Sequence, residues 1–146
     1  DLTLWNGYCQ VHAIFSLKDL IKLKVRHPEA ETLAHPECDE TLLEQADFIG
    51  STTALINRTQ KSNCKEFIIV TEPGVIHQME KMDSTKKYIP LANNEGCACN
   101  ECPHMRLNTI DKMIHTLESK TPEIILDEEV MRKATPPLLR MLDLSK

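Results

Sequence analysis

The chain of 146 residues is 41% hydrophobic and 27% charged, and its formal net charge is −5. This composition suits a globular domain with its own core, and it argues against nucleic acid or an anionic membrane as the main partner, because both attract basic surfaces. No apolar run approaches the about 20 residues that a membrane helix needs.

Short apolar segments recur along the chain between turn signals, and we predict that they form β-strands. The clearest predicted strand is residues 66–71, an almost continuous apolar run of the kind found in buried parallel strands. The predicted strands are residues 2–5, 32–35, 48–49, 66–71 and 88–90.

Helical segments alternate with these strands and start at residues that cap helices well, such as serine and aspartate. The turn Glu72-Pro73-Gly74 leads into one of them, and we interpret it as a turn only. Predicted helices begin at Ser16 with Asp19, at Asp39, at Ser51 or Thr52, after Gly74, and at Asn108 with Asp111. Two more are predicted over residues 127–134 and 137–144.

Alternating strands and helices indicate an α/β fold, with a short parallel sheet and helices on its faces. The carboxyl ends of parallel strands share one edge of the sheet. The polar groups that follow the predicted strands should therefore face one site, although they are scattered along the sequence.

Three cysteines, Cys97, Cys99 and Cys102, fall within six residues and are followed by a proline. Such spacing fits a soft metal, an iron–sulfur cluster or a disulfide. Structural zinc usually takes two ligand pairs, and no second pair exists here, so a cluster that draws single cysteines from distant loops fits better. We interpret Cys38 and Cys64 as ordinary buried thiols.

Two further groups follow predicted strand ends. Cys9 and His12 form a C-x-x-H, and each also has a structural explanation as a buried thiol or a helix-start histidine. The segment His35-Pro36-Glu37 holds an imidazole and a carboxylate close together, which suits acid–base chemistry, or else is a capped turn.

The segment Gly50-Ser51-Thr52 offers hydroxyls and helix-start amides. These groups could bind a phosphate or carboxylate, or could simply cap a helix.

Together these segments resemble one family, quinolinate synthase. Their order and spacing agree with the family along nearly the whole chain. The matching segments are residues 5–12, 35–37, 46–47 with 50–52, 71–75, 99–105 and 137–142.

The resemblance implies an enzyme of NAD biosynthesis that condenses iminoaspartate with dihydroxyacetone phosphate to quinolinate. It implies three α/β domains around a pseudo-threefold axis, this chain supplying the third as a three-layer αβα domain. It also implies a [4Fe–4S] cluster, held by three cysteines, whose open iron acts as a Lewis acid.

The resemblance also assigns roles to residues. Cys9 and Cys102 match cluster ligands, whereas Cys97 and Cys99 do not. Glu37 matches the proton shuttle and His35 a second catalytic group. The substrate-binding positions are His12, His35, Pro36, Glu37, Ser51 and Thr52.

Family members are much longer than this chain, which aligns with their C-terminal part. Residues 1–11 then match the last strand of a missing preceding domain and a cluster-cysteine loop. The remaining parts are an α/β domain over 12–95, the cysteine loop 96–105, and a helical tail 106–146 that packs on a missing N-terminal domain.

We therefore expect the chain alone to be unstable, domain-swapped or oligomeric, or one piece of a nicked or larger molecule, and unable to hold a complete cluster. The implied partners are the two substrates, the missing N-terminal half, and functionally an aspartate oxidase or dehydrogenase that makes iminoaspartate. The expected location is the cytoplasm, or an organelle stroma such as a plastid.

Two alternatives remain open from the residues. One is a non-catalytic zinc-binding or redox-sensing module built on the Cys97–Cys102 loop, in which Cys99 and Cys102 could form a regulatory disulfide. The other is a catalytically inactive remnant used for assembly.

Overall fold

The computed structural model describes residues 5–92 and 100–146. The chain divides into two compact units, residues 1–106 and residues 107–146. The strand predicted over residues 2–5 lies almost wholly outside the described residues, as do Cys97 and Cys99. No helix in the described parts is long and apolar enough to cross a membrane.

The first unit is built on a four-stranded parallel sheet with the strand order β2-β1-β3-β4. This confirms the predicted α/β class. The bounds of its strands are Glu31–Ala34 for β1, Phe48–Ile49 for β2, Glu66–Val70 for β3 and Lys87–Pro90 for β4. Strand β1 lies one residue earlier than predicted.

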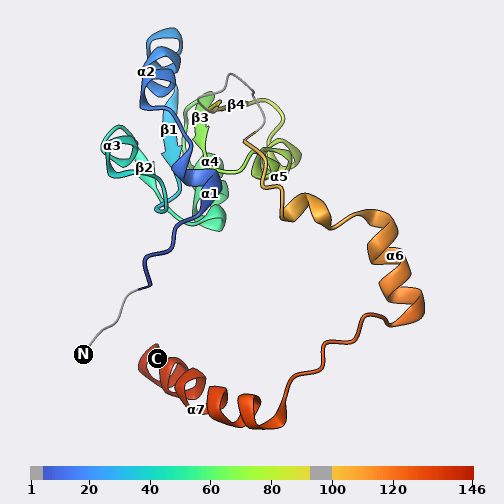
Figure 1. The fold of residues 1–146 in the computed structure, drawn as a ribbon. Coiled ribbons are helices and arrows are strands. Elements are labelled where there is room, and N and C mark those ends of the chain that lie inside the picture. Colours follow the sequence, from blue (N-terminus) through green and yellow to red (C-terminus); the bar gives the residue numbers. More distant parts are fainter. Residues whose placement is uncertain (1–4, 93–99) are drawn as a thin grey trace. The chain divides into compact units, whose positions relative to one another are not determined.

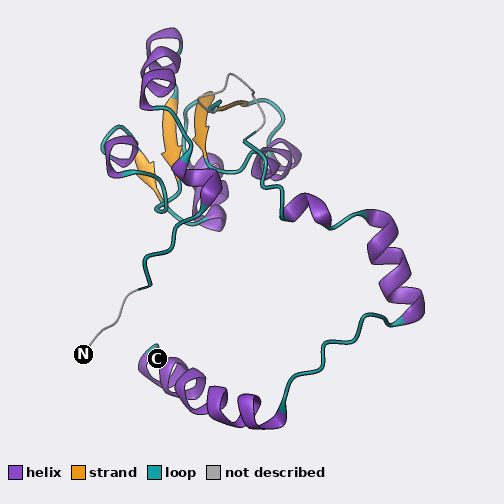
Figure 2. Ribbon diagram, in the orientation of Figure 1, coloured by secondary structure: helices purple, strands orange, loops and turns teal. Residues whose placement is uncertain are grey.

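Helices cover both faces of this sheet (Figures 1 and 2), as the alternating sequence pattern predicts. Their bounds are Gln10–Ala13 for α1, Leu17–Arg26 for α2, Glu40–Leu43 for α3, Thr52–Lys61 for α4 and Gly74–Met82 for α5.

Two apolar cores, one on each face of the sheet, hold the three layers together. Because side chains alternate along a strand, β3 contributes Ile68 and Val70 to one core and Phe67 and Ile69 to the other. The first core includes residues of α2 and α3, and the second includes residues of α4 and α5. The central strands are thus buried on both sides, as in most parallel sheets.

Local capping fixes where the helices begin. The hydroxyl of Ser16 accepts a hydrogen bond from the backbone N–H of Asp19, and Ser51 accepts one from Ala54. Asp39 caps α3 in the same way through the N–H of Thr41. Each bond satisfies one of the amides that a helix start leaves without a partner, and the caps predicted at these positions are confirmed.

The second unit consists of helices α6, Ile110–Ser119, and α7, Glu128–Leu144, preceded by the short 3₁₀ turn η1, Met105–Leu107. Helix α6 is capped by Thr109, whose hydroxyl accepts from the N–H of Lys112, so the prediction of Asn108 as its first residue was wrong by one position. Helix α6 ends before Pro122, and the backbone of its C-cap residue, Lys120, has the left-handed conformation.

Helix α7 corrects another prediction. We expected two helices separated by Pro136, but one helix runs through both Pro136 and Pro137. A proline inside a helix removes one hydrogen bond and crowds the carbonyl four residues earlier, at a cost of about 3 kcal/mol. Its fixed φ lies in the helical range, however, and here the helix continues through both prolines. The cap at Asp127, which accepts from the N–H of Val130, is confirmed.

Candidate functional site

The candidate site lies at the carboxyl ends of β1 and β3, where the strand order reverses. From β1 the chain goes to β2 on one side and then to β3 on the other. Ligand sites of open parallel sheets favour this position. His35 follows β1 and Thr71 follows β3, and the backbone N–H of His35 donates to the carbonyl of Val70 at 3.1 Å.

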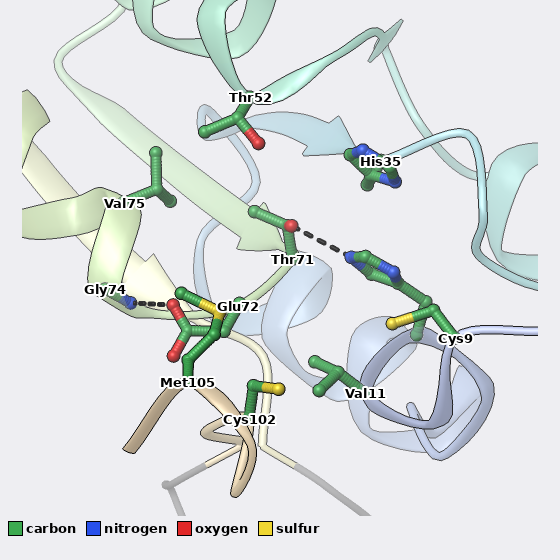
Figure 3. A pocket seen from close by; sticks show the side chains of 11 residues that line it. Cys9, Val11, His35, Thr52, Thr71, Glu72, Gly74, Val75, Cys102 and Met105 are labelled. Atoms are coloured by element: carbon green, nitrogen blue, oxygen red, sulfur yellow. Dashed lines mark hydrogen bonds between the residues drawn. The ribbon is translucent and has the colours of Figure 1, made fainter. Parts of the chain in front are cut away.

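A cavity of about 340 Å³ opens at this edge (Figure 3). It joins residues that are far apart in the sequence, from the start of α1 to the segment after the cysteine loop. Its lining residues are Cys9, Val11, His12, His35, Thr52, Thr71, Glu72, Gly74, Val75, Cys102 and Met105.

Two cysteines border this cavity. Cys9 precedes the first turn of α1, and Cys102 lies in the segment after residue 99. Both thiols are partly exposed, and Figure 3 shows their sulfur atoms directed toward the space between the two segments. The structure thus places at one cavity the two cysteines that the family resemblance matches to cluster ligands.

His12 links two other side chains of the site. Its Nδ1 lies 3.0 Å from Oε2 of Glu37, and its Nε2 lies 3.0 Å from the hydroxyl oxygen of Thr71. Since a carboxylate only accepts, Nδ1 carries the proton and Nε2 accepts from Thr71. The ring is 7% exposed, and this burial lowers the pKa of His12 despite the opposing effect of Glu37. His12 is therefore a neutral imidazole with a fixed tautomer.

His35 stacks on His12 with ring centroids 4.4 Å apart and an angle of 7° between the planes. The backbone N–H of Glu37 donates to Nδ1 of His35 at 3.3 Å. In its neutral form His35 then carries its proton on Nε2, where it can donate to a ligand. His35 borders the cavity.

Pro36 and Glu37 follow His35 in the chain and are not among the residues that line the cavity. The Glu37 side chain is 55% exposed, and its Oε2 lies 4.0 Å from Nδ1 of His35. Glu37 therefore connects to the cavity through His12. A proton could move between them along the 3.0 Å hydrogen bond.

The two hydroxyl residues that follow β2, Ser51 and Thr52, have different positions in the structure. Thr52 lines the cavity, whereas Ser51 uses its hydroxyl to cap α4. Of the two candidate anion-binding hydroxyls, Thr52 is thus the one at the cavity.

Thr71 and Glu72 also line the cavity. Both belong to the polar groups at strand ends that we expected to face one site, but the sequence assigned neither a role in it. We had interpreted Glu72 as part of a turn only. Its side chain is 15% exposed, its Oε2 accepts from the N–H of Gly74 at 2.7 Å, and its Oε1 lies 3.8 Å from Arg106. Their position directly after the most apolar strand was the available signal, since that is where parallel sheets place ligand groups.

The ligand atoms of Cys9, His12 and Glu37 all lie within 4.8 Å of one another, so these three residues could hold a metal ion. Both ring nitrogens of His12 already have partners, so such an ion would have to displace one of them. The donor set of thiolate, imidazole and carboxylate suits borderline-soft metals such as zinc or iron.

Cys38 is buried, as predicted, and its thiol donates to the carbonyl of Val70 at 3.4 Å. Burial raises the pKa of Cys38 to about 11, so at neutral pH it is a thiol and a poor metal ligand. Cys64 is only partly buried and packs against the core on the other face of the sheet.

Comparison with known proteins agrees with the resemblance seen in the sequence. Residues 1–143 match the profile of the family described as "NadA: Quinolinate synthetase A protein". Among curated relatives, the quinolinate synthase of Synechocystis sp. is 53% identical over 145 residues, which are 99% of this chain and 46% of the relative.

The quinolinate synthase of Trichodesmium erythraeum is 52% identical over 99% of this chain and 45% of its own length. That of Chloroherpeton thalassium is 52% identical over 100% of the chain and 46% of its own length. The chain thus spans a little under half the length of these relatives.

Proposed function

Because the chain belongs to the quinolinate synthetase A protein family, we propose that it supplies part of the active site of a quinolinate synthase, which condenses iminoaspartate with dihydroxyacetone phosphate. The observation that carries this proposal is that Cys9 and Cys102 border one cavity together with His12, His35 and Thr52.

The residues at this cavity fit the [4Fe–4S] cluster that we propose as the cofactor. Cys9 and Cys102 present partly exposed thiols to the same space, and thiolates are the ligands that such clusters prefer. The family resemblance implies that the third ligand comes from outside this chain, and Cys38, which is buried with a raised pKa, is poorly suited to replace it. When bound, the cluster would supply Lewis acidity at an open iron.

The histidines and Glu37 would handle substrate protons. Glu37 is the proposed proton shuttle, because its carboxylate bonds to His12, whose ring borders the cavity. His35, with a proton on Nε2, would donate to a substrate oxygen. Condensation with loss of water and phosphate requires such transfers to carbonyl oxygens and at carbons next to a carbonyl or an imine.

Thr52 would hold a substrate phosphate or carboxylate at the start of α4, where the helix amides and dipole favour negative charge. Ser51 would assist by fixing that helix start, and Pro36 by holding His35 and Glu37 in their turn. Val75 and Met105 give the cavity an apolar part that limits water.

The proposed partners follow from this reaction. They are the two small substrates, the remaining part of a full-length quinolinate synthase, and functionally an aspartate oxidase or dehydrogenase that produces iminoaspartate. The proposed location is the cytoplasm or an organelle stroma.

The test is to purify the protein at its natural length without oxygen and to measure quinolinate formation and bound iron. Cys9→Ser and Cys102→Ser should each lose iron, the absorption near about 400 nm and activity, because each removes a proposed thiolate ligand. Cys64→Ser is the matched control and should keep all three. Iron and activity retained in Cys9→Ser would overturn the proposal, and bound zinc without the absorption would favour the zinc module instead.

A further inference from the structure

Asn100 is a buried polar residue in the segment that carries Cys102. Its side chain is 2% exposed, and its amide nitrogen donates to the backbone carbonyl of Val11 at 2.8 Å. The two residues are 89 positions apart in the sequence. This bond therefore ties the segment after residue 99 to the helix that begins after Cys9.

The carbonyl that accepts this bond has a particular need for a donor. Helix α1 has only four residues, Gln10–Ala13, and the last carbonyls of a helix find no partner within the helix. Val11 is itself buried, so water is a poor substitute. A buried carbonyl that loses its donor is costly, and this gives the amide of Asn100 a strong reason to stay in place.

Each partner in this bond lies close in sequence to one of the two cysteines. Cys9 lies two residues before Val11, and Cys102 lies two residues after Asn100. Val11 and both cysteines line the same cavity (Figure 3). The bond thus connects the two segments at points two residues away from each cysteine.

The contacts of Arg106, near the end of the segment that carries Cys102, do not involve α1. Arg106 lies 2.7 Å from Glu101 and 3.8 Å from Glu72, so it connects the segment to the end of β3 through an ion pair whose arginine is 55% exposed. The backbone N–H of Arg106 donates to the carbonyl of Cys102 within the segment itself. Among these contacts, the bond of Asn100 is the one that reaches α1.

We propose that Asn100 is a positioning residue that holds Cys102 opposite Cys9, so that both thiols can bind one inorganic centre. The proposal rests on the proposed function for its purpose, but the placement of the two cysteines can be measured without any cluster. Asn100 does not itself bind substrate or metal in this role.

The experiment uses the natural-length protein with Cys97→Ser and Cys99→Ser, so that neither can compete for Cys102. The cluster-free protein is treated with a short bifunctional thiol reagent, and the peptide that joins Cys9 to Cys102 is quantified by mass spectrometry. In parallel, iron per chain is measured after anaerobic reconstitution. Thermal unfolding of each variant is recorded.

Asn100→Ala and the size-matched Asn100→Asp both remove the amide donor. We expect each to lower the yield of the Cys9–Cys102 cross-link and the bound iron by about fivefold or more, because the carbonyl of Val11 loses its partner. Thr59→Ala is the control, since Thr59 is equally buried and its hydroxyl donates to the carbonyl of Ile56 within α4. It should lower the melting temperature but leave the cross-link unchanged.

An unchanged cross-link in both Asn100 variants would overturn the proposal, as would an equal loss in Thr59→Ala. Complete unfolding of both Asn100 variants would also count against it, because Asn100 would then serve the fold as a whole. Failure of the proposed function looks different: the parent protein would cross-link normally but bind no iron.

Discussion

The two sides of the cavity are held in place in different ways. On the histidine side, His35 and Thr71 continue directly from paired strands, and His12 is bonded to Thr71 and Glu37. On the cysteine side, the segment of Cys102 depends on the bond of Asn100 and the ion pairs of Arg106. The sheet therefore positions the proton-handling groups, and a few polar contacts position the thiols.

This difference predicts that the two sides can be damaged separately. A change on the histidine side should affect proton transfer and leave cluster binding intact. A change on the cysteine side should affect cluster binding first.

Replacing Thr71 by valine removes the hydroxyl that donates to Nε2 of His12 and leaves a buried nitrogen without its donor. The loss of such a partner costs about 1–3 kcal/mol, so we expect quinolinate formation to fall by roughly 10- to 100-fold. Bound iron should stay at the level of the unchanged protein, because Cys9 and Cys102 keep their positions.

Thr71→Ser restores the hydroxyl and is expected to recover most of the lost rate. Nitrogen NMR of His12 would show the cause directly, as the tautomer should become mixed in Thr71→Val only. If Thr71→Val lost iron as strongly as it lost activity, the two sides of the cavity would not be separable.

The pH dependence of the free energy of unfolding, through the thiol of Cys38, tests how firmly the end of β3 is packed. Burial raises the pKa of Cys38 from 9.0 to about 11, so the folded chain keeps this proton longer than the unfolded chain. Its contribution to stability is complete below about pH 9 and is lost as the pH rises through about 11. We expect the loss to be of order 2 kcal/mol.

Denaturant unfolding between pH 8 and pH 11 measures this loss, and Cys38→Ala should show a smaller decline over the same range. At pH 8.5 an alkylating reagent should also modify Cys64 faster than Cys38, since Cys64 is only partly buried. Equal rates for the two thiols would mean that this part of the sheet edge opens readily.

Sequence reasoning found the features that local chemistry determines. The caps at Ser16, Asp39 and Ser51 depend on residues two or three positions away, and the parallel sheet follows from apolar strands that alternate with helices. The family resemblance, rather than spacing alone, pointed to Cys9 and Cys102, and the structure brings both to one cavity.

The features that the sequence did not predict are of two kinds. Some are hydrogen bonds to partners far away in the sequence, and one is a helix that continues although its prolines are locally unfavourable. Nothing near Asn100 indicates that its amide bonds to Val11, 89 positions away, and nothing near Thr71 indicates a bond to His12. The single helix through Pro136 and Pro137 was missed because local rules treat proline as a helix break. Seven further helical residues follow the second proline, from residue 138 to residue 144.

The smallest expected effect concerns Arg106 on the cysteine side. Its guanidinium lies 2.7 Å from Glu101 and 3.8 Å from Glu72, but the arginine side chain is 55% exposed. Exposed ion pairs contribute about 0–1 kcal/mol and are screened by salt, so Arg106→Gln should lower iron binding by about twofold at most. Lys133→Gln, which breaks the exposed pair with Glu129 inside α7, is the matched control.

The useful comparison is therefore between Arg106→Gln and Asn100→Ala in the same reconstitution, at low and at high salt. A small, salt-dependent loss in the first and a large, salt-independent loss in the second would assign the placement of Cys102 to the buried bond. If Arg106→Gln lost as much iron as Asn100→Ala, the segment would be held by its tie to the end of β3, and the two sides of the cavity would share one support.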